Sequence, residues 1–418
     1  MKILLLDHPQ FTHGTWMLYE GIVRIFGRDA ITLFPPKPCF YGLEPPKKLR
    51  LLDTRWYRDV YKSIESKKLP NGIPPFAPGE MLTSLDPREG FGYHIIDYNN
   101  VISDFPDKSY QQNIDEDEVA ELINKHYYDF IILGNGHRVP TIALARLRSM
   151  CKELPPIVYF DPGERDEFNA HWWHVFHPNI TFKQTLTPQI MAQIGTPQVP
   201  CEMFPLPLSH PTTFHDRPIS YHRDDSFFTN RQIDVISSFG PTWPARTEVQ
   251  HRVEQTCSKL SMVGHFNAIL NGYNAEQLSN TKISVSMRGS GRDTERYWEM
   301  PHRGCAMVCD GTMGCIHPFP FRDKESAVFY RNLDEVESSI MYLLNDEENR
   351  IRIAKNGCQL IHKYHSIEGR AMFFIGILKE KLGINLTTIQ ASKIQEWYDI
   401  LGWNSHLPEW RGEVSSYD

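Results

Sequence analysis

The stretch that decides the fold is 282-KISVSMRGSGRDTERYWEMPHRGCAMV-308. It opens with apolar residues at every second position, which is the period of a β-strand. The residues of this run are Ile283, Val285 and Met287. A glycine-broken, charged loop follows over 288–293, and 294–300 has the apolar spacing of a short helix. We expect Pro301 and Gly304 to end that helix, and the next residues, Cys-Ala-Met-Val, predict a second buried strand.

Strand, glycine loop, helix and strand form the unit with which α/β proteins hold phosphates. Loop amides and the positive end of a helix favour an anion, and Arg288 and Arg292 add full charges. Glu299 lies one turn further and could accept hydrogen bonds from ribose hydroxyls. The alternative is an ordinary βα connection with surface arginines, because glycine loops before helices are common.

This stretch resembles the nucleotide-sugar-binding region of GT-B glycosyltransferases, and specifically the spore-maturation-protein-like (CgeB-like) group. The shared pattern is Arg-x-x-Glu with a glycine five residues further on, here Arg296, Glu299 and Gly304. The resemblance implies that Glu299 contacts the ribose of the donor. Many retaining relatives carry another glutamate eight residues earlier, where this chain has Gly291. A role of that first glutamate therefore cannot be carried over to this chain.

A second glycine loop is expected after a strand at 232–238. Gly240 follows that strand, and Arg246 stands near the start of the next helix, a pairing that suits phosphate and that the resemblance also matches. The candidate donor-binding residues are Glu299, Arg292, Arg288, Gly289, Gly291, Asp293, Thr294, Arg296, Gly240 and Arg246.

Composition is that of a globular protein with more than one domain. The chain has 418 residues, 41% hydrophobic and 23% charged, with a net charge of −7 that argues against non-specific coating of nucleic acid. The apolar runs are too short to span a bilayer, and MKILLLDHPQ reads as a first strand, so we expect a cytoplasmic protein. Eight scattered cysteines without a Cys-x-x-Cys pair make a zinc ribbon improbable.

The order of predicted strands and helices indicates an α/β protein, and the resemblance implies the GT-B fold, in which two Rossmann-like domains face a central cleft. We expect an N-terminal acceptor domain over 1–208 with an insertion at about 35–115, and a linker over 209–230. The C-terminal nucleotide-sugar-binding domain would span 231–385, and a helical tail 386–418. The resemblance is strongest over about 230–380.

Charged residues gather where strands of the first predicted sheet end, which is where open α/β sheets place their sites. The candidate catalytic residues are Asp161, His13 and Glu164. Each has a structural alternative, namely a loop hydrogen bond for the histidine and helix capping or dipole complementarity for the two acids. His137 and Arg165 are candidate acceptor-binding residues. Glu167, His171 and His174 could share a helical face, but core histidines are a better interpretation than a metal site, and we predict no metal.

The segment 37–68 differs in charge from the rest of the chain. It has nine Lys or Arg against four Asp or Glu, with five aromatic residues interleaved. Such a pattern suits a nucleic acid or an acidic acceptor, with Lys47 and Arg55 as candidate contacts. Alternatively the long basic side chains cover a small satellite core.

The preferred function is transfer of a hexosyl or pentosyl group from a nucleotide-diphospho-sugar, a UDP-sugar among the candidates, to a hydroxyl acceptor. The acceptor would be a glycan, a protein or a hydroxymethylated DNA base, with no required cofactor and with the stereochemistry open. The alternative from another functional class is a non-catalytic nucleotide-responsive binding protein. It stays open because Gly291 stands where many retaining relatives have a glutamate. A dehydrogenase or epimerase is disfavoured because Gly-x-Gly-x-x-Gly does not follow the first strand.

Overall fold

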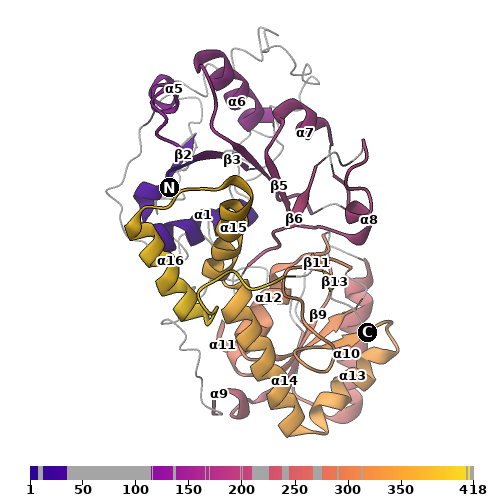
Figure 1. Ribbon diagram of the computed structural model, residues 1–418. Helices are drawn as coiled ribbons and strands as arrows, with labels where there is room; N and C mark the ends of the chain where they lie inside the picture. The colour runs from indigo at the N-terminus through magenta and orange to yellow at the C-terminus, as the bar shows by residue number, and fades with distance from the viewer. Residues whose placement is uncertain are drawn as a thin grey trace, which may run out of the picture.

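The structure is a computed structural model of the chain (Figure 1). It describes residues 1–7, 13–34, 114, 116–134, 138–164, 166–168, 170–197, 199, 201–209, 226–237, 244–266, 275–289, 291–311, 314–410 and 413–414. The predicted insertion and the basic segment 37–68 lie outside the described residues, apart from Ile114 in the insertion.

The first sheet has six parallel strands in the order β2-β1-β3-β4-β5-β6. Its strands are β1 (Ile3–Asp7), β2 (Ile31–Phe34), β3 (Phe130–Gly134), β4 (Ile157–Asp161), β5 (Ile180–Lys183) and β6 (Met203–Pro205). The strands are nearly continuous apolar runs because both faces of the sheet are covered. Ile3 and Leu5 join one core cluster, whereas Leu4 and Leu6 point to the cluster on the opposite face.

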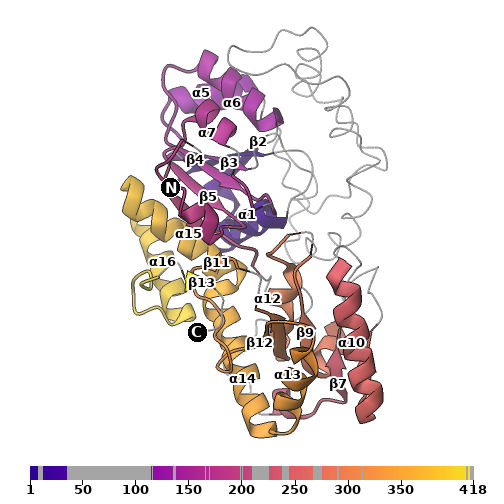
Figure 2. The ribbon, with the colours of Figure 1, turned by 90° about the vertical axis from the view of Figure 1, so that its right-hand side faces the viewer.

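Helices from both ends of the chain cover this sheet. The N-terminal ones are α1 (His13–Phe26), the 3-10 turn η1 (Arg28–Ala30), α5 (Glu116–Asn124), α6 (Arg138–Met150), α7 (Ala170–Phe176) and α8 (Pro188–Met191). The C-terminal ones are α15 (Ile367–Leu382) and α16 (Thr388–Leu401), which lie beside α1 in both ribbon views (Figures 1 and 2). α1 crosses α15 closely at Gly21, where an added Cβ would lie 2.5 Å from the Ile367 carbonyl oxygen.

The second sheet has five parallel strands in the order β12-β10-β9-β7-β8. Its strands are β7 (Ile233–Ile236), β8 (Gly264–His265), β9 (Thr281–Ser286), β10 (Ala306–Asp310) and β12 (Val328–Tyr330). Its helices are α9 (Ser226–Thr229), α10 (Pro244–Leu260), α11 (Ala275–Ser279), α12 (Glu295–His302), α13 (Glu335–Leu344) and α14 (Glu347–Leu360). Ile283 and Val285 of β9 pack with α10, α13 and α14, as the alternating pattern predicts.

Both sheets reverse their strand order beside the first strand, between β1 and β3 and between β7 and β9. Ligands of open parallel sheets bind at such switch points, outside the carboxyl ends of the strands. The loop 288–293 leaves the carboxyl end of β9 and is therefore placed at the switch point of the second sheet.

The described chain leaves the first sheet after Leu208 and returns through the π-helical turn η5 (Ile361–His365). Ser366 begins α15 as its N-cap, because its side chain accepts a hydrogen bond from Gly369 N at 3.0 Å. The second sheet is thus joined to the first at two places, near Leu208 and near Ser366.

One expectation about local structure is wrong. Pro301 does not end its helix, since α12 continues to His302; the buried Met300, Pro301 and His302 hold this last turn in the core. Gly304 closes it, with a φ of 76°. The helical turn α9 within the expected linker and the short antiparallel pair β11 (Ile316–His317) and β13 (Glu413–Val414) were not predicted.

Candidate functional site

Glu299 is the buried carboxylate of the candidate donor site. It lies on α12 and is 1% exposed. Its Oε2 is 3.4 Å from Arg296 Nη1, whereas its Oε1 has no hydrogen-bond partner among the described residues. Burial raises the pKa of Glu299 to about 7, although Arg296 and Arg303 oppose that rise. A buried acceptor oxygen without a donor is costly in the absence of a ligand and suits a bound hydroxyl.

Arginines surround the first turn of the loop. Arg246, on α10, donates from Nε to the Arg288 carbonyl oxygen at 2.8 Å and from Nη2 to that of Met287 at 3.2 Å. It therefore holds the backbone where β9 turns into the loop. The pKa of Arg246 falls to about 10 because its guanidinium is buried and Arg296 repels it. Cations held this close together favour an anion between them.

Thr294 stands at the N-cap of α12, which has 8 residues. Its side chain makes no capping hydrogen bond, and its buried Oγ1 has no partner among the described residues. The positive end of the helix dipole and this hydroxyl face the loop, whose Gly289 and Gly291 are buried. This end of α12 thus combines the positive end of the helix dipole with a hydroxyl that makes no capping bond, and both favour an anion.

The loop touches the first sheet at three consecutive residues. An added Cβ at Gly291 would lie 2.5 Å from Glu164 Cβ, so the two chains meet there without space for a side chain. Arg292 Nε donates to Asp166 Oδ1 at 2.6 Å, and this hydrogen bond lowers the pKa of Asp166 and raises that of Arg292. Asp293 Oδ2 accepts from Leu208 N at 2.6 Å. The carboxyl edges of the two sheets therefore face and touch each other.

Behind the loop lies a buried aromatic and charged cluster. Asp293 Oδ1 accepts from Trp298 Nε1 at 2.8 Å, and burial raises the pKa of Asp293 to about 6. The Arg370 guanidinium lies 5.1 Å from the centre of the Trp298 ring, and its three nitrogens have no hydrogen-bond partner among the described residues. Burial lowers the pKa of Arg370 to about 9 and that of His317 to about 3. Asp293 is thus fixed by the Trp298 indole and the backbone amide of Leu208.

On the first sheet, Asp161 is committed to structural contacts. Its Oδ2 is 2.9 Å from Nζ of the buried Lys183, and its Oδ1 accepts from Gly163 N at 2.8 Å. Glu164, three residues on, is exposed and faces Gly291. Of the two acids predicted here, Glu164 is the one that reaches the loop 288–293.

Several predicted site residues lie outside the described residues: Gly240, His137, Arg165, Lys47 and Arg55. His13 begins α1, but its side chain is not described. Among the residues not singled out from the sequence, Asp166, Leu208 and Arg370 make contacts of the loop region. Asp166 stood within a charged run at a strand end, a signal that could have pointed to it.

The conceivable metal face is not formed, because α7 begins at Ala170 and excludes Glu167. Within the described segments, His, Cys, Asp and Glu side chains do not converge in groups of three that could hold a metal ion. Of the helices in those segments, none is long and apolar enough to cross a bilayer.

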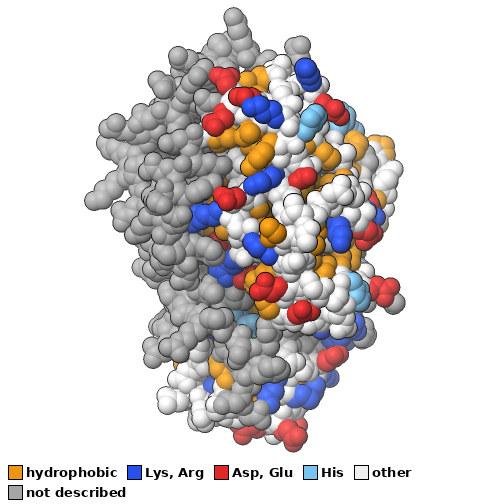
Figure 3. All heavy atoms as spheres, turned by 60° about the vertical axis from the view of Figure 1, so that its left-hand side comes forward, with side chains coloured by type: hydrophobic (Ala, Val, Ile, Leu, Met, Phe, Trp, Pro, Cys, Tyr) orange, Lys and Arg blue, Asp and Glu red, His pale blue; other side chains and the backbone are white. Residues whose placement is uncertain are grey.

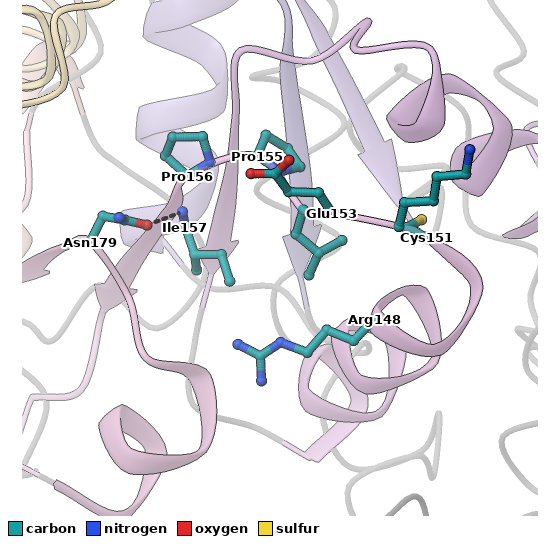
Figure 4. A pocket seen from close by; sticks show the side chains of 9 residues that line it. Arg148, Cys151, Glu153, Pro155, Pro156, Ile157 and Asn179 are labelled. Atoms are coloured by element: carbon teal, nitrogen blue, oxygen red, sulfur yellow. Dashed lines mark hydrogen bonds between the residues drawn. The ribbon is translucent and has the colours of Figure 1, made fainter.

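A pocket of 420 Å³ lies away from this site, at the amino end of β4 (Figure 4). It is lined by Arg148, Cys151, Lys152, Glu153, Leu154, Pro155, Pro156, Ile157 and Asn179. Ile157 N donates to Asn179 Oδ1 at 2.8 Å, and Arg148 bonds the carbonyl oxygens of Val175 and Phe176. These contacts occupy Arg148 and Asn179 in holding the amino end of β4 and the end of α7.

Residues 229–376 match a protein family described as glycosyl transferase-like. This range contains β9, the loop 288–293 and α12. No curated protein matches the chain in sequence.

The structure is similar to a glycosyltransferase from Rickettsia africae ESF-5, with a TM-score of 0.51 and 9% identity over 92% of this chain and 99% of that chain. It is also similar to HepE from Anabaena, crystallised with UDP, with a TM-score of 0.49 and 12% identity over 91% and 100% of the two chains. A third similar structure is sucrose-phosphate synthase from Thermosynechococcus elongatus, with a TM-score of 0.43 and 11% identity over 92% and 99%. Two parallel α/β sheets with facing carboxyl edges form the GT-B fold, which confirms the predicted fold class.

Proposed function

We propose that the protein is a glycosyltransferase that moves a sugar from a nucleotide-diphospho-sugar to a hydroxyl acceptor. The observation that carries the proposal is the buried Glu299 carboxylate, whose Oε1 has no partner among the described residues. It lies beside Arg296 and within the segment that matches a glycosyl transferase-like family. A free carboxylate oxygen next to cations suits a ligand that is both hydroxylated and anionic, as a ribose with its diphosphate is.

The proposed donor site divides the ligand between the N-terminus of α12 and Glu299, in the second turn of this helix. Glu299 would accept hydrogen bonds from the ribose hydroxyls. The N-terminus of the helix, with Thr294, Arg288 and Arg292, would hold the diphosphate and stabilise the charge on the leaving group. Arg246 would contribute charge and keep the loop backbone in place.

A thermal-shift panel of UDP, GDP, ADP and dTDP and their glucose or mannose conjugates tests this site. A nucleotide that raises the midpoint of the parent should have a much smaller effect on Glu299→Ala, because its ribose contact is lost. Glu348→Ala, which removes an exposed glutamate from the first turn of α14, is the matched control. Equal stabilisation of the parent and Glu299→Ala would remove the assignment of Glu299.

The acceptor is proposed to enter from the first sheet, with Asp161, His13 and Glu164 as the candidate bases. Engagement of Asp161 with Lys183 and Gly163 favours a positioning role for that residue. A glycan, a protein or a DNA base would each supply a hydroxyl. Binding of a duplex oligonucleotide that weakens steeply with salt would support the DNA acceptor, and salt-insensitive or absent binding would exclude it.

Finer assignments stay proposals: the CgeB-like subgroup, hexosyl or pentosyl transfer, and a division into units near 1–208 and 231–385. The packing of α15 on α1 supports adding 367–382 to the N-terminal unit. The described face in Figure 3 intersperses acidic and basic side chains, as on a solvated surface, and thus gives no support to a broad polyanion-binding face there.

The second candidate is a nucleotide-responsive binding protein without turnover, favoured by the absence of a side chain at Gly291. Hydrolysis of nucleotide-sugars in the absence of an acceptor separates the two functions. Release of nucleoside diphosphate supports the transferase, whereas tight nucleotide binding without turnover of any donor and acceptor pair supports the binding protein.

A further inference from the structure

The contact between Gly291 and Glu164 joins the two sheets. Gly291 is buried in the donor loop, and Glu164 follows β4 of the first sheet. An added Cβ at Gly291 would lie 2.5 Å from Glu164 Cβ and 2.9 Å from both its Cγ and its Oε2. Separations this short to a Cβ atom cannot be relieved by a side-chain rotation. Glycine at 291 therefore makes room for the glutamate that arrives from the opposite sheet.

Glu164 brings a negative charge to a cationic loop. It is exposed, and its charge acts on Arg246, where it opposes the fall in the arginine pKa. Asp166, two residues on, is bonded to Arg292 at 2.6 Å, which fixes this segment of the first sheet against the loop. The backbone that carries Glu164 is thus held beside the loop by the bond between Asp166 and Arg292.

Recognition of a nucleotide-sugar requires hydrogen-bond acceptors on the protein as well as hydrogen-bond donors. Arginine side chains only donate hydrogen bonds, so Arg288 and Arg292 can bind phosphate oxygens but cannot recognise the hydroxyls of a sugar. Asp293 is occupied by Leu208 and Trp298, and Glu299 lies further along α12. Among the described acids near the loop, Glu164 combines exposure with direct contact to Gly291.

We propose that Glu164 accepts hydrogen bonds from the hydroxyls of the transferred sugar and thereby determines which nucleotide-sugar binds. This inference rests on the proposed glycosyl transfer and specifies one of its determinants. The site is then composite. Groups of the second sheet donate hydrogen bonds to the diphosphate, and a carboxylate of the first sheet accepts hydrogen bonds from the sugar hydroxyls. The sugar is recognised only while the carboxyl edges of the two sheets are in contact, whereas the diphosphate binds to the second sheet alone.

Exchange of the two residues tests the proposal. For the nucleotide pair that stabilises the parent most, such as UDP and UDP-glucose, calorimetry would give both dissociation constants and their ratio. The variants are Glu164→Gln, Glu164→Gly, Gly291→Glu and the double variant Glu164→Gly with Gly291→Glu. Glu167→Gly is the matched control, since Glu167 is an exposed glutamate three residues away in the same segment.

Loss of the Glu164 carboxylate should reduce the preference for nucleotide-sugar over nucleotide by about tenfold, the effect of one hydrogen bond to a charged group, while affinity for the nucleotide changes little. Gly291→Glu should also lose the preference, because two side chains then compete for one space. The double variant should regain most of it, and Glu167→Gly should behave as the parent.

An unchanged ratio in Glu164→Gln and Glu164→Gly would overturn the inference and leave the proposed donor site intact. So would a double variant that binds the nucleotide normally yet discriminates no better than Glu164→Gly. A parent that binds no nucleotide at all would refute the proposed function, and this inference with it.

Discussion

Replacement of Glu299 by glutamine should change the pH dependence of stability. The carboxylate is 1% exposed, and burial raises its pKa from 4.5 to about 7. An acid with a raised pKa binds its proton more tightly in the folded state, so the folded state loses stability as the pH rises from 4.5 through 7. The shift corresponds to about 3 kcal/mol above pH 7. Glutamine has the same shape without the charge and should remove this loss.

The measurement is the urea unfolding midpoint of parent and variant between pH 5 and pH 8. The free energy of unfolding of Glu299→Gln should rise relative to that of the parent by up to about 3 kcal/mol between pH 5 and pH 8. Nucleotide affinity should fall by about tenfold or more in the same variant, because an amide accepts a weaker hydrogen bond from ribose than a carboxylate does. The variant would thus be more stable and less able to bind.

Glu348→Gln is the control for loss of one glutamate, since Glu348 is exposed to solvent. Its stability should follow the parent across the pH range. A difference between Glu299→Gln and the parent that stays constant from pH 5 to pH 8 would refute the reasoning about burial. Unchanged nucleotide affinity would separately refute the ribose contact.

Three further changes test the surroundings of the site. Asp166→Asn should tighten nucleotide binding by about 2–5-fold in calorimetry at low salt, since the carboxylate competes with phosphate for Arg292; weaker binding would contradict this. Arg370→Met should raise the free energy of unfolding by about 1–4 kcal/mol by removing a buried cation, whereas Arg370→Lys should not; a less stable Met variant would show that the charge is compensated. Gly21→Ala should lower the unfolding midpoint by the equivalent of about 1–3 kcal/mol, because the added methyl group would meet the Ile367 carbonyl oxygen. An unchanged midpoint would show that α1 and α15 can move apart without loss of stability.

Apart from the half-buried β8, the strands of both sheets could be predicted from the sequence because they are largely buried. Runs such as Phe130–Gly134 and Ala306–Asp310 contain too few polar residues to lie at a surface, and their spacing leaves room for one helix between strands. The ends of helices were harder to predict where tertiary packing overrides the conformational preference of the local residues. Pro301 stays helical since its turn is buried, a fact that the local sequence does not contain.

The proposed donor site could be derived from the sequence only in so far as it lies within one segment. The loop, α12 and Glu299 are close in sequence, and their residue types indicate an anion and a ribose. The bond between Arg292 and Asp166 spans 126 residues, and its formation depends on how the two sheets face each other. Arg370 was missed because a single arginine in a helix reads as solvent-exposed. Its neighbours Ala371, Met372 and Phe373 are apolar around the whole helix, which is the pattern of a buried helix.

Asp293 connects the loop 288–293 with both places where the sheets are joined. Its Oδ2 accepts from Leu208 N, where the chain leaves the first sheet, and its Oδ1 accepts from the Trp298 indole. That indole faces Arg370 on α15, the helix by which the chain returns. A rotation of one sheet against the other must therefore strain or break contacts of the loop that would bind the diphosphate. A ligand that fixed this loop would therefore also favour one relative orientation of the two sheets, through the contacts of Asp293.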